Sequence, residues 1–432
     1  MEDIRTAGGR IHDALRKHGV DKAGFWVTET ETQEFNVGGG EFNLLRTLFD
    51  KGFNLTVYHQ NKKGSIATNK LDDVSINKAV EDALASAESG VADEAYDIAP
   101  GQGKLCFHDK GYEPDIEHLF ERTRELMADI EKRHPKVLVD QLTVSHRKIH
   151  TLYLNTNGTE CEVFKGNYTV SISFAGHEGE VTTSLMGTDV MTDDLDRPFI
   201  ELGTIETQLK DAQAQLVTMP LEGKFEGTIV LTPDSLGSFL YSILMNFAGD
   251  SAILEKTSLW LDKLNQKVAD DRLTISVKPS DPRIVDRAHI TADGFQEEDY
   301  EIIKDGVLKS FMLSLYVANK SGFEREKSSS FSVIIEGGTT PYEEMLKGIR
   351  KGLIVGRFSG GRPGTSGDFS GVAKNSFLVE NGKITGAVSE TMISGNLARM
   401  LMDLVDISKE TVADGSGVLP YIAFDKIVIS GK

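Results

Sequence analysis

Histidine, cysteine and glycine are the residue types whose spacing in this chain bears most directly on chemistry. Of the ten histidines, only His146 and His150 are four residues apart, the spacing that places two imidazoles on one face of a helix for zinc. The segment Leu142–Leu154 alternates like a strand instead, so we expect both histidines to be solvated strand residues. The sequence contains no HExxH motif. Histidine spacing therefore predicts no metal site.

Cysteine is rare, with only Cys106 and Cys161 in 432 residues. Two cysteines form neither a disulfide framework nor a CxxC pair, which excludes a cysteine-rich zinc site and favours a reducing compartment. Neither residue lies in a recognised nucleophile context, and no GxSxG motif is present. We expect both thiols to be buried and inert.

Glycine is abundant, with 42 residues, but the phosphate-binding motifs GxxxxGK[ST] and GxGxxG are absent. The densest segment, Gly356–Gly371, has two interpretations. It forms turns in a β-rich domain, or it lines a cleft where the backbone comes close to a peptide or another ligand. In the second case the substrate-binding residues would be Arg357, Asp368, Ser370, Lys374 and Asn375, with Glu390 and Asn396 from a helix-like segment. Spacing alone does not separate the two interpretations.

The charge balance restricts the possible partners. Forty-seven Lys and Arg residues against 66 Asp and Glu give a net charge of −19, which argues against nucleic acid and against an anionic membrane surface. The beginning of the chain, Met1–Ile4, has no basic region followed by an apolar core, so it is not a signal peptide. The longest uncharged stretch, 235–249, is too short to span a bilayer. We therefore expect a cytoplasmic protein without nucleic-acid or membrane partners.

In the first half, helical apolar stripes alternate with strand-like segments. The expected helices are 2–18, 73–89, 115–134 and 199–217. The expected strands are 44–49 and 53–58, followed by antiparallel strands over 137–186 with turns at 157–158 and 176–179. The segment 90–114 is expected to be an irregular linker.

In the second half, single helices lie between strands without regular βαβ alternation. The expected strands and hairpins are 227–231, 300–312, 330–335, 377–388 and 421–429, and the expected helices are 234–247, 315–321, 342–350 and 391–405. This pattern predicts an α+β fold with antiparallel or mixed sheets. A break at 220–226 predicts two domains, 1–220 and 221–432.

Several segments of the second half together resemble the signature of the PmbA/TldD family, which is often labelled "modulator of DNA gyrase". They are VGRFSG at 355–360, GDFSGVAKN at 367–375, ENGKI at 380–384 and ETMISGNL at 390–397. Upstream, GDSA at 249–252, GVLKS at 306–310 and GSIATN at 64–69 are also similar to family segments, in the same order. The resemblance covers most of the chain.

The resemblance implies intracellular proteolysis or peptide maturation by a two-subunit assembly with an enclosed cavity. In one branch, which is TldD-like, HExxxH on a helix and a downstream cysteine bind the catalytic metal, and the Glu acts as general base on a metal-bound water. Here the corresponding helix, 234–250, offers Leu240, Tyr241, Leu244 and Met245. No cysteine follows Cys161. The chain therefore resembles the PmbA/TldE-like branch, which lacks the metal ligands.

Two function hypotheses follow. In the first, the chain is the non-metal-binding subunit of a peptidase that degrades or matures peptides or unfolded proteins. It then has no catalytic residues and no cofactor of its own, and a TldD-like partner carries the metal, which we expect to be zinc. In the second, the chain is a non-proteolytic binding or regulatory module that acts as a homodimer. The charge of −19 disfavours direct binding to DNA.

Overall fold

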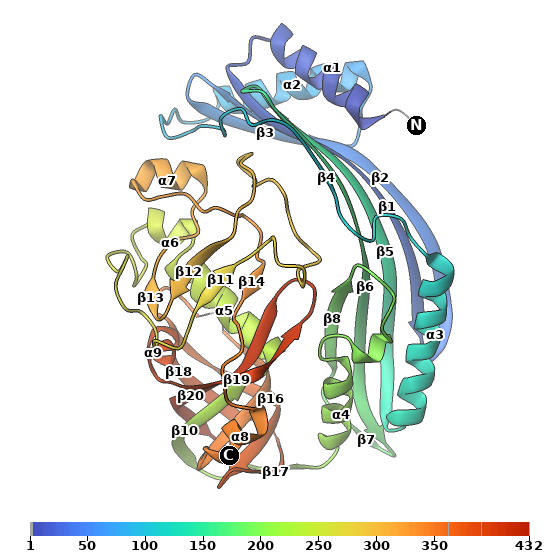
Figure 1. The fold of residues 1–432 in the computed structure, drawn as a ribbon, viewed down its shortest axis with the longest axis vertical. Coiled ribbons are helices and arrows are strands. Elements are labelled where there is room, and N and C mark those ends of the chain that lie inside the picture. The colour runs from blue at the N-terminus through green and yellow to red at the C-terminus, as the bar shows by residue number, and fades with distance from the viewer. Residues whose placement is uncertain (1–2, 362, 390, 432) are drawn as a thin grey trace.

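The computed structural model describes residues 3–361, 363–389 and 391–431. It has two lobes that face each other (Figure 1). The N-terminal lobe comprises the first sheet with helices α1–α4, and the C-terminal lobe comprises the second sheet with helices α5–α9. Both sheets contain antiparallel and parallel strand pairs, so the predicted α+β class is confirmed. Whether residues 1–220 and 221–432 fold as separate domains stays a prediction.

The first sheet has the strand order β3-β2-β1-β5-β6-β4, and β7 and β8 also pair with β6. Its strands are β1 Lys22–Gly38, β2 Glu41–His59, β3 Lys62–Thr68, β4 Gly103–His108, β5 Val137–Asn155, β6 Thr159–Glu178, β7 Val181–Thr182 and β8 Met186–Thr192. The sheet curves into a half-barrel whose concave side faces the C-terminal lobe (Figure 1).

Helices cover the convex side of the half-barrel (Figure 1). They are α1 Ile4–Lys17, α2 Asp73–Glu88 and α3 Ile116–Arg133. The first two bury apolar stripes on Phe25, Val27 and their neighbours, as the sequence periodicity predicts. The 3₁₀ helix Phe199–Glu201 and α4 Ile205–Ala214 follow β8 and lead to the C-terminal lobe.

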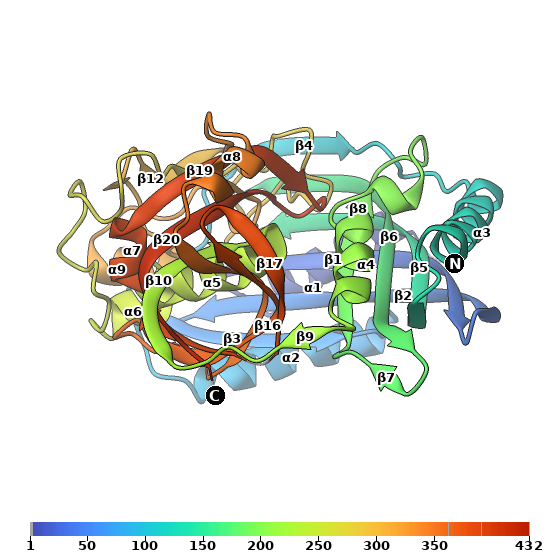
Figure 2. The same ribbon diagram turned by 90° about the horizontal axis from the view of Figure 1, so that it is seen from below.

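The second sheet contains a closed ring of five strands, seen from below in Figure 2. In the ring, β10 pairs with β15 and β20, β15 pairs with β16, and β18 joins β16 to β20. The ring strands are β10 Lys224–Leu231, β15 Lys351–Gly360, β16 Asp368–Glu380, β18 Thr391–Asn396 and β20 Val418–Ser430. The remaining strands are β9 Thr218–Met219, β11 Ile275–Val277, β12 Tyr300–Lys304, β13 Val307–Leu308, β14 Val333–Ile334, β17 Lys383–Val388 and β19 Leu404–Ala413.

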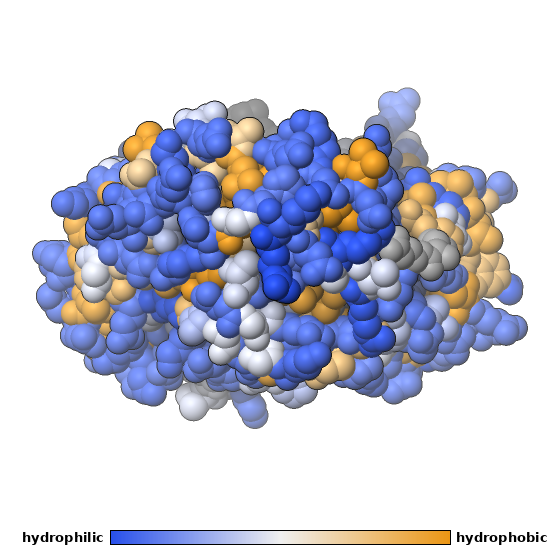
Figure 3. Space-filling model, turned by 90° about the horizontal axis from the view of Figure 1, so that it is seen from above, coloured by the Kyte–Doolittle hydropathy of each residue, from blue (hydrophilic) through white to orange (hydrophobic). Residues whose placement is uncertain are grey.

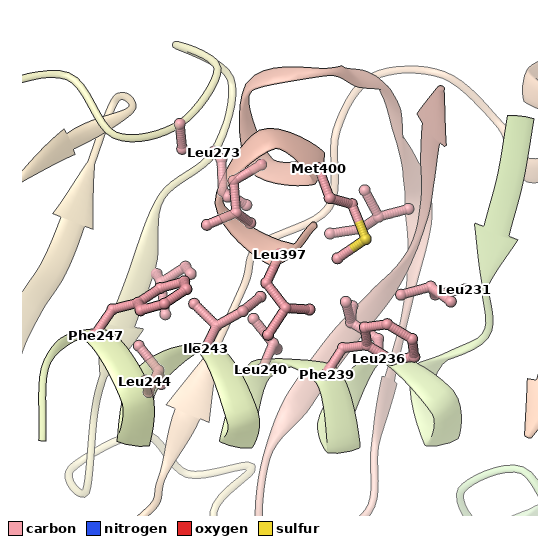
Figure 4. Packing of buried hydrophobic residues seen from close by; sticks show 14 of the residues in the cluster. Leu231, Leu236, Phe239, Leu240, Ile243, Leu244, Phe247, Leu273, Leu397 and Met400 are labelled. Atoms are coloured by element: carbon pink, nitrogen blue, oxygen red, sulfur yellow. The ribbon is translucent and has the colours of Figure 1, made fainter. Parts of the chain in front are cut away.

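Helix α5 (Pro233–Phe247) is the centre of the C-terminal core. Thr232 caps its first turn by accepting a hydrogen bond from the backbone N–H of Ser235, and Pro233 takes the first helical position, where no N–H is needed. Its apolar face contacts β15, β20 and α9 (Leu397–Met402). Figure 4 shows Leu397 and Met400 of α9 on this face of the helix. The other helices of this lobe are α6 Asp250–Leu254, α7 Leu315–Ser321 and α8 Tyr342–Lys347.

Four expectations about secondary structure are wrong. Residues 391–396 are strand β18 and not helix, because Thr391 and Ile393 are buried while Met392 between them is exposed, the alternation of a strand. Segments 44–49 and 53–58 form one strand, β2, because β1 pairs with it throughout. The linker 90–114 contains β4, and the helix expected over 199–217 is the 3₁₀ helix followed by α4.

Candidate functional site

The predicted substrate-binding residues lie on three neighbouring strands of the ring. Arg357 of β15 is paired in register with Lys374 of β16, and Asn375 follows. At the other end of β16, the Asn396 amide donates to Asp368 Oδ1 at 2.9 Å. Ser370, near that end, is paired with Ser394. Glu390 lies outside the described residues. Asp368 and Asn375 are seven residues apart on one strand, which separates them by about 20 Å, so the set divides into two groups at opposite ends of the strand.

The group that contains Arg357 and Asn375 borders a pocket between the lobes, with a cavity volume of about 210 Å³. We call it the interlobe pocket. From the N-terminal lobe it is lined by Met186, Gly187, Thr204, Thr207, Gln208 and Asp211. From the C-terminal lobe it is lined by Thr232, Asp234, Ser235, Ser238, Gly356, Arg357, Phe358, Asn375 and Tyr421. Lys374 and Asn375 also line an adjoining pocket with Gln215 and Ser389.

Asp234, in the first turn of α5, joins the two lobes across the interlobe pocket. Its Oδ1 accepts hydrogen bonds from the hydroxyl of Thr204 at 2.8 Å and from that of Thr188 at 3.4 Å, both in the N-terminal lobe. Burial among the surrounding protein atoms raises the pKa of Asp234, although these hydrogen bonds oppose the change and the side chain remains open to the pocket.

Asp211 of α4 is a second carboxyl group in the pocket. Burial, reinforced by the nearby charge of Asp234, raises the pKa of Asp211 to about 7. Burial and these two carboxylates raise the pKa of Tyr421 to about 12. The pocket therefore holds acidic groups in protonation states that an added positive charge would change.

Gly356 brings β15 and β16 close together beside the pocket. A Cβ atom at Gly356 would lie 2.4 Å from the backbone oxygen of Asn375, so only glycine fits without a shift of the strands. Asn375 has φ 49°, a left-handed conformation that Asn tolerates. Arg357, the residue after Gly356, donates to the backbone oxygen of Leu185 at 3.0 Å and so reaches the N-terminal lobe. The glycine-rich segment is thus the β15–β16 hairpin, and one end of it borders a pocket.

Sequence reasoning missed Asp211, Asp234, Thr204 and Gln208. A usable signal exists on α4, where residues 204, 208 and 211 repeat at helical spacing and form a polar stripe beside the buried residues 205, 209 and 212. Nothing in the sequence shows that this stripe faces Asp234, because the two lie on different lobes.

The helix that resembles a metal-binding helix does not fit a metal ion. Leu240 and Leu244 are buried in the C-terminal core, and the exposed Tyr241 places its ring 5.6 Å from that of Phe331. These side chains carry no donor atoms suited to a divalent cation. Within residues 3–361, 363–389 and 391–431, no three His, Cys, Asp or Glu side chains are grouped so that they could hold a metal.

The two thiols differ in exposure. Cys161 is buried, as expected, and burial raises the pKa of its thiol to about 12. Cys106 is exposed, so the expectation that it is buried is wrong. It lies on β4, the edge strand of the half-barrel, where its sulfur is 3.5 Å from Nε2 of His108.

The middle of the concave side of the half-barrel has a mainly polar lining. Along β1, Phe25 and Val27 point to the helices, whereas Thr28, Thr30 and Thr32 point to the opposite side. Their register partners on β5 are Thr151, Ile149 and Arg147.

The helices of the described segments are too short or too polar to span a bilayer.

Comparison with known proteins gives a consistent result. Residues 223–431 match the family described as PmbA/TldA metallopeptidase C-terminal domain. The chain is 26% identical to Metalloprotease PmbA of Escherichia coli O157:H7, over 93% of this chain and 91% of that protein. It is 22% identical to a zinc metalloprotease TldD homolog of Saccharolobus solfataricus, over 84% and 83%.

Solved structures share the fold over the whole chain. TldE of Thermococcus kodakarensis superposes with a TM-score of 0.83 at 19% identity, covering 98% of this chain and 100% of that one. A Bacteroides thetaiotaomicron protein described as a candidate modulator of DNA gyrase superposes with a TM-score of 0.88 at 23% identity, covering 100% of both chains.

Proposed function

Because the chain belongs to the PmbA/TldD family of metallopeptidases, we propose that it is the subunit without metal in a two-subunit intracellular peptidase. A TldD-like partner supplies the metal, which we expect to be zinc. This chain completes an enclosed cavity and holds an extended peptide or an unfolded segment there. The observation that carries the proposal is the chemistry of α5, where the buried Leu240 and Leu244 and the exposed Tyr241 supply none of the usual zinc ligands.

The polar concave wall supports a role in holding peptide. Hydroxyl groups such as those of Thr28 and Thr151, which lie 3.3 Å apart, can donate to and accept from a peptide backbone regardless of its side chains. A sheet whose convex side is covered by helices and whose other side is polar is suited to line a water-filled cavity. The wall therefore fits a subunit that accepts many sequences.

The outer edge of β2 supports the presence of a second subunit. Residues 41–52 pair with β1 on one side. Among the described residues no strand pairs with their other side, since β3 ends at Thr68, the partner of Phe53. Large apolar side chains are exposed along this edge: Phe42, Leu44, Leu45, Leu48 and Phe49. Figure 3 shows hydrophobic residues gathered at the end of the molecule that carries α3 and the β1–β2 hairpin. An uncovered apolar edge of this length is the kind of surface that a partner chain covers.

The test is reconstitution with a TldD-like chain. Peptide cleavage is measured for each purified chain alone and for the mixture, with and without a chelator. We expect cleavage only by the mixture and its loss on chelation. Cleavage by this chain alone that resists the chelator would refute the proposal, and so would full activity of the TldD-like chain alone.

A matched pair of variants tests the assembly surface. Leu45→Asp places a charge on the β2 edge, and Val91→Asp places the same charge on an exposed apolar residue elsewhere. We expect only Leu45→Asp to abolish co-elution with the TldD-like chain. A stable homodimer that ignores the TldD-like chain would favour the non-proteolytic module instead.

A further inference from the structure

The interlobe pocket has an unbalanced charge. Its charged lining residues are Asp211, Asp234 and Arg357. The hydrogen-bond partners of Asp234 are uncharged threonine hydroxyls. The lysine next to Asp211, Lys210, pairs with Glu206 at 3.2 Å. Among the described residues neither carboxyl group forms an ion pair, and both face the cavity.

Ser235 gives an independent sign that a polar group in the wall of the pocket lacks a partner. Its side chain is 2% exposed and lines the pocket. Within the described part of the chain, its buried hydroxyl has no hydrogen-bond partner. A buried hydroxyl without a partner is costly, and such groups in folded proteins are nearly always satisfied by protein, water or ligand.

The other polar residues of the lining can bind the acyl oxygen that lies next to an ammonium group. The Arg357 guanidinium and the side-chain amides of Gln208 and Asn375 are donors for an acyl oxygen. The cavity volume of about 210 Å³ has room for a small amino acid or for the first residue of a peptide. The combination of acidic and donor groups matches a ligand that carries an ammonium group beside a carbonyl or carboxylate.

We propose that the interlobe pocket binds a primary α-ammonium group together with its adjacent acyl oxygen. The ammonium group lies between Asp211 and Asp234, and the acyl oxygen lies toward Arg357. Two sources present this chemistry, a free amino acid and the amino terminus of a peptide. Reading the ligand as a peptide end rests on the proposed function, whereas binding itself requires no partner subunit.

The electrostatics of the pocket agree with this placement. The pKa of Asp211 and that of Asp234 are both raised, because burial disfavours their charged forms. An ammonium group within hydrogen-bond distance stabilises the charged forms, so binding lowers both pKa values and releases protons. Calorimetry in two buffers of different ionisation enthalpy reports the net proton exchange, which also includes the protons that a peptide amine takes up at pH 7.5.

The test uses the purified full chain and isothermal titration calorimetry at pH 7.5. The probes are L-alanine, tri-alanine and N-acetyl-tri-alanine, whose acetyl group removes the ammonium charge. We expect saturable binding of an amine-bearing probe and at least tenfold weaker binding of the acetylated peptide, since a charge-assisted hydrogen bond is lost. Tighter binding of alanine identifies a free amino acid as the ligand, and tighter binding of tri-alanine identifies a peptide terminus.

Variants locate the site. Asp234→Asn should weaken binding of the amine-bearing probe by about tenfold, whereas Asp262→Asn, which removes the same charge at an exposed position outside the pocket, should leave it unchanged. Equal binding of free and acetylated tri-alanine overturns the proposal, and so does the absence of binding up to about 10 mM. The acetylated probe needs no variant, so misfolding of Asp234→Asn leaves the test decisive. Failure here leaves the reconstitution assay, and hence the proposed function, untouched.

Discussion

Replacement of Asp211 by Asn should make the chain more stable at alkaline pH and leave it unchanged at acidic pH. Folding raises the pKa of Asp211 from its ordinary value of 3.8 to about 7. Below pH 3.8 the carboxyl is protonated in both the folded and the unfolded chain. As the pH rises from 3.8 to 7, the unfolded chain releases the proton first, so the stability of the folded chain falls. Above pH 7 the penalty is complete.

The magnitude follows from the difference between the two pKa values. The difference is 7 − 3.8 = 3.2, which at 1.36 kcal/mol each sets a ceiling of about 4 kcal/mol. Asp211 lines a pocket that water enters, so screening reduces the expected penalty to about 2 kcal/mol. Asn keeps the shape of the side chain and removes the charge. At pH 8 the variant should therefore be more stable than the parent chain by about 2 kcal/mol.

The assay is urea unfolding of parent and variant at pH 4 and pH 8. These values lie on either side of the isoelectric point of about 5.0, where the chain is least soluble. Asp262→Asn is the control, because its side chain is 80% exposed. An effect of Asp211→Asn that is the same at both pH values would refute the reasoning, since a packing effect does not depend on protonation.

Three further predictions concern packing and reactivity. Leu244→Ala in the core of the C-terminal lobe should lower the free energy of unfolding by about 2–5 kcal/mol, measured by denaturant titration, and a loss below about 1 kcal/mol would contradict the close packing of α5. Gly356→Ala should lower the midpoint of thermal unfolding, because its Cβ would lie 2.4 Å from a backbone oxygen. The control Gly361→Ala, whose Cβ would have no atom within 4 Å, should leave the midpoint unchanged. Equal midpoints for the two variants would contradict the close approach of the strands. Iodoacetamide should label Cys106 in the folded chain and label Cys161 only after unfolding, as read by mass spectrometry; early labelling of Cys161 would show that it is not shielded.

The spacing of apolar residues correctly predicted the helices that bury one face. The helices near residues 2–18, 73–89 and 115–134 carry apolar stripes at helical spacing, and each is a helix with a buried face. The prediction of a helix over residues 391–396 is wrong because a strand precedes α9 directly. The apolar residues of the two elements merge into one helix-like run. In that run, the alternation of Thr391, Met392 and Ile393 was too short to stand out.

The interlobe pocket could be predicted only in part. Arg357 and Asn375 were found because they lie in a glycine-rich signature. Asp211 and Asp234 were not found, because their meeting depends on how α4 docks against the beginning of α5. That contact is set by tertiary packing between the lobes, and no residue spacing encodes it.

Closure of the five-stranded ring has a consequence for synthesis of the chain. Strand β10 pairs with β20, and the register partners Lys224 and Ser430 are 430 − 224 = 206 residues apart. At about 5–20 residues per second, a ribosome needs about 10–40 s to make the intervening chain. During this time β10 and the apolar face of α5 have no ring to join, while the earlier half-barrel strands already have their neighbours. The C-terminal lobe therefore depends on protection from aggregation for longer than the N-terminal lobe, and chaperone depletion should trap it preferentially in nascent chains.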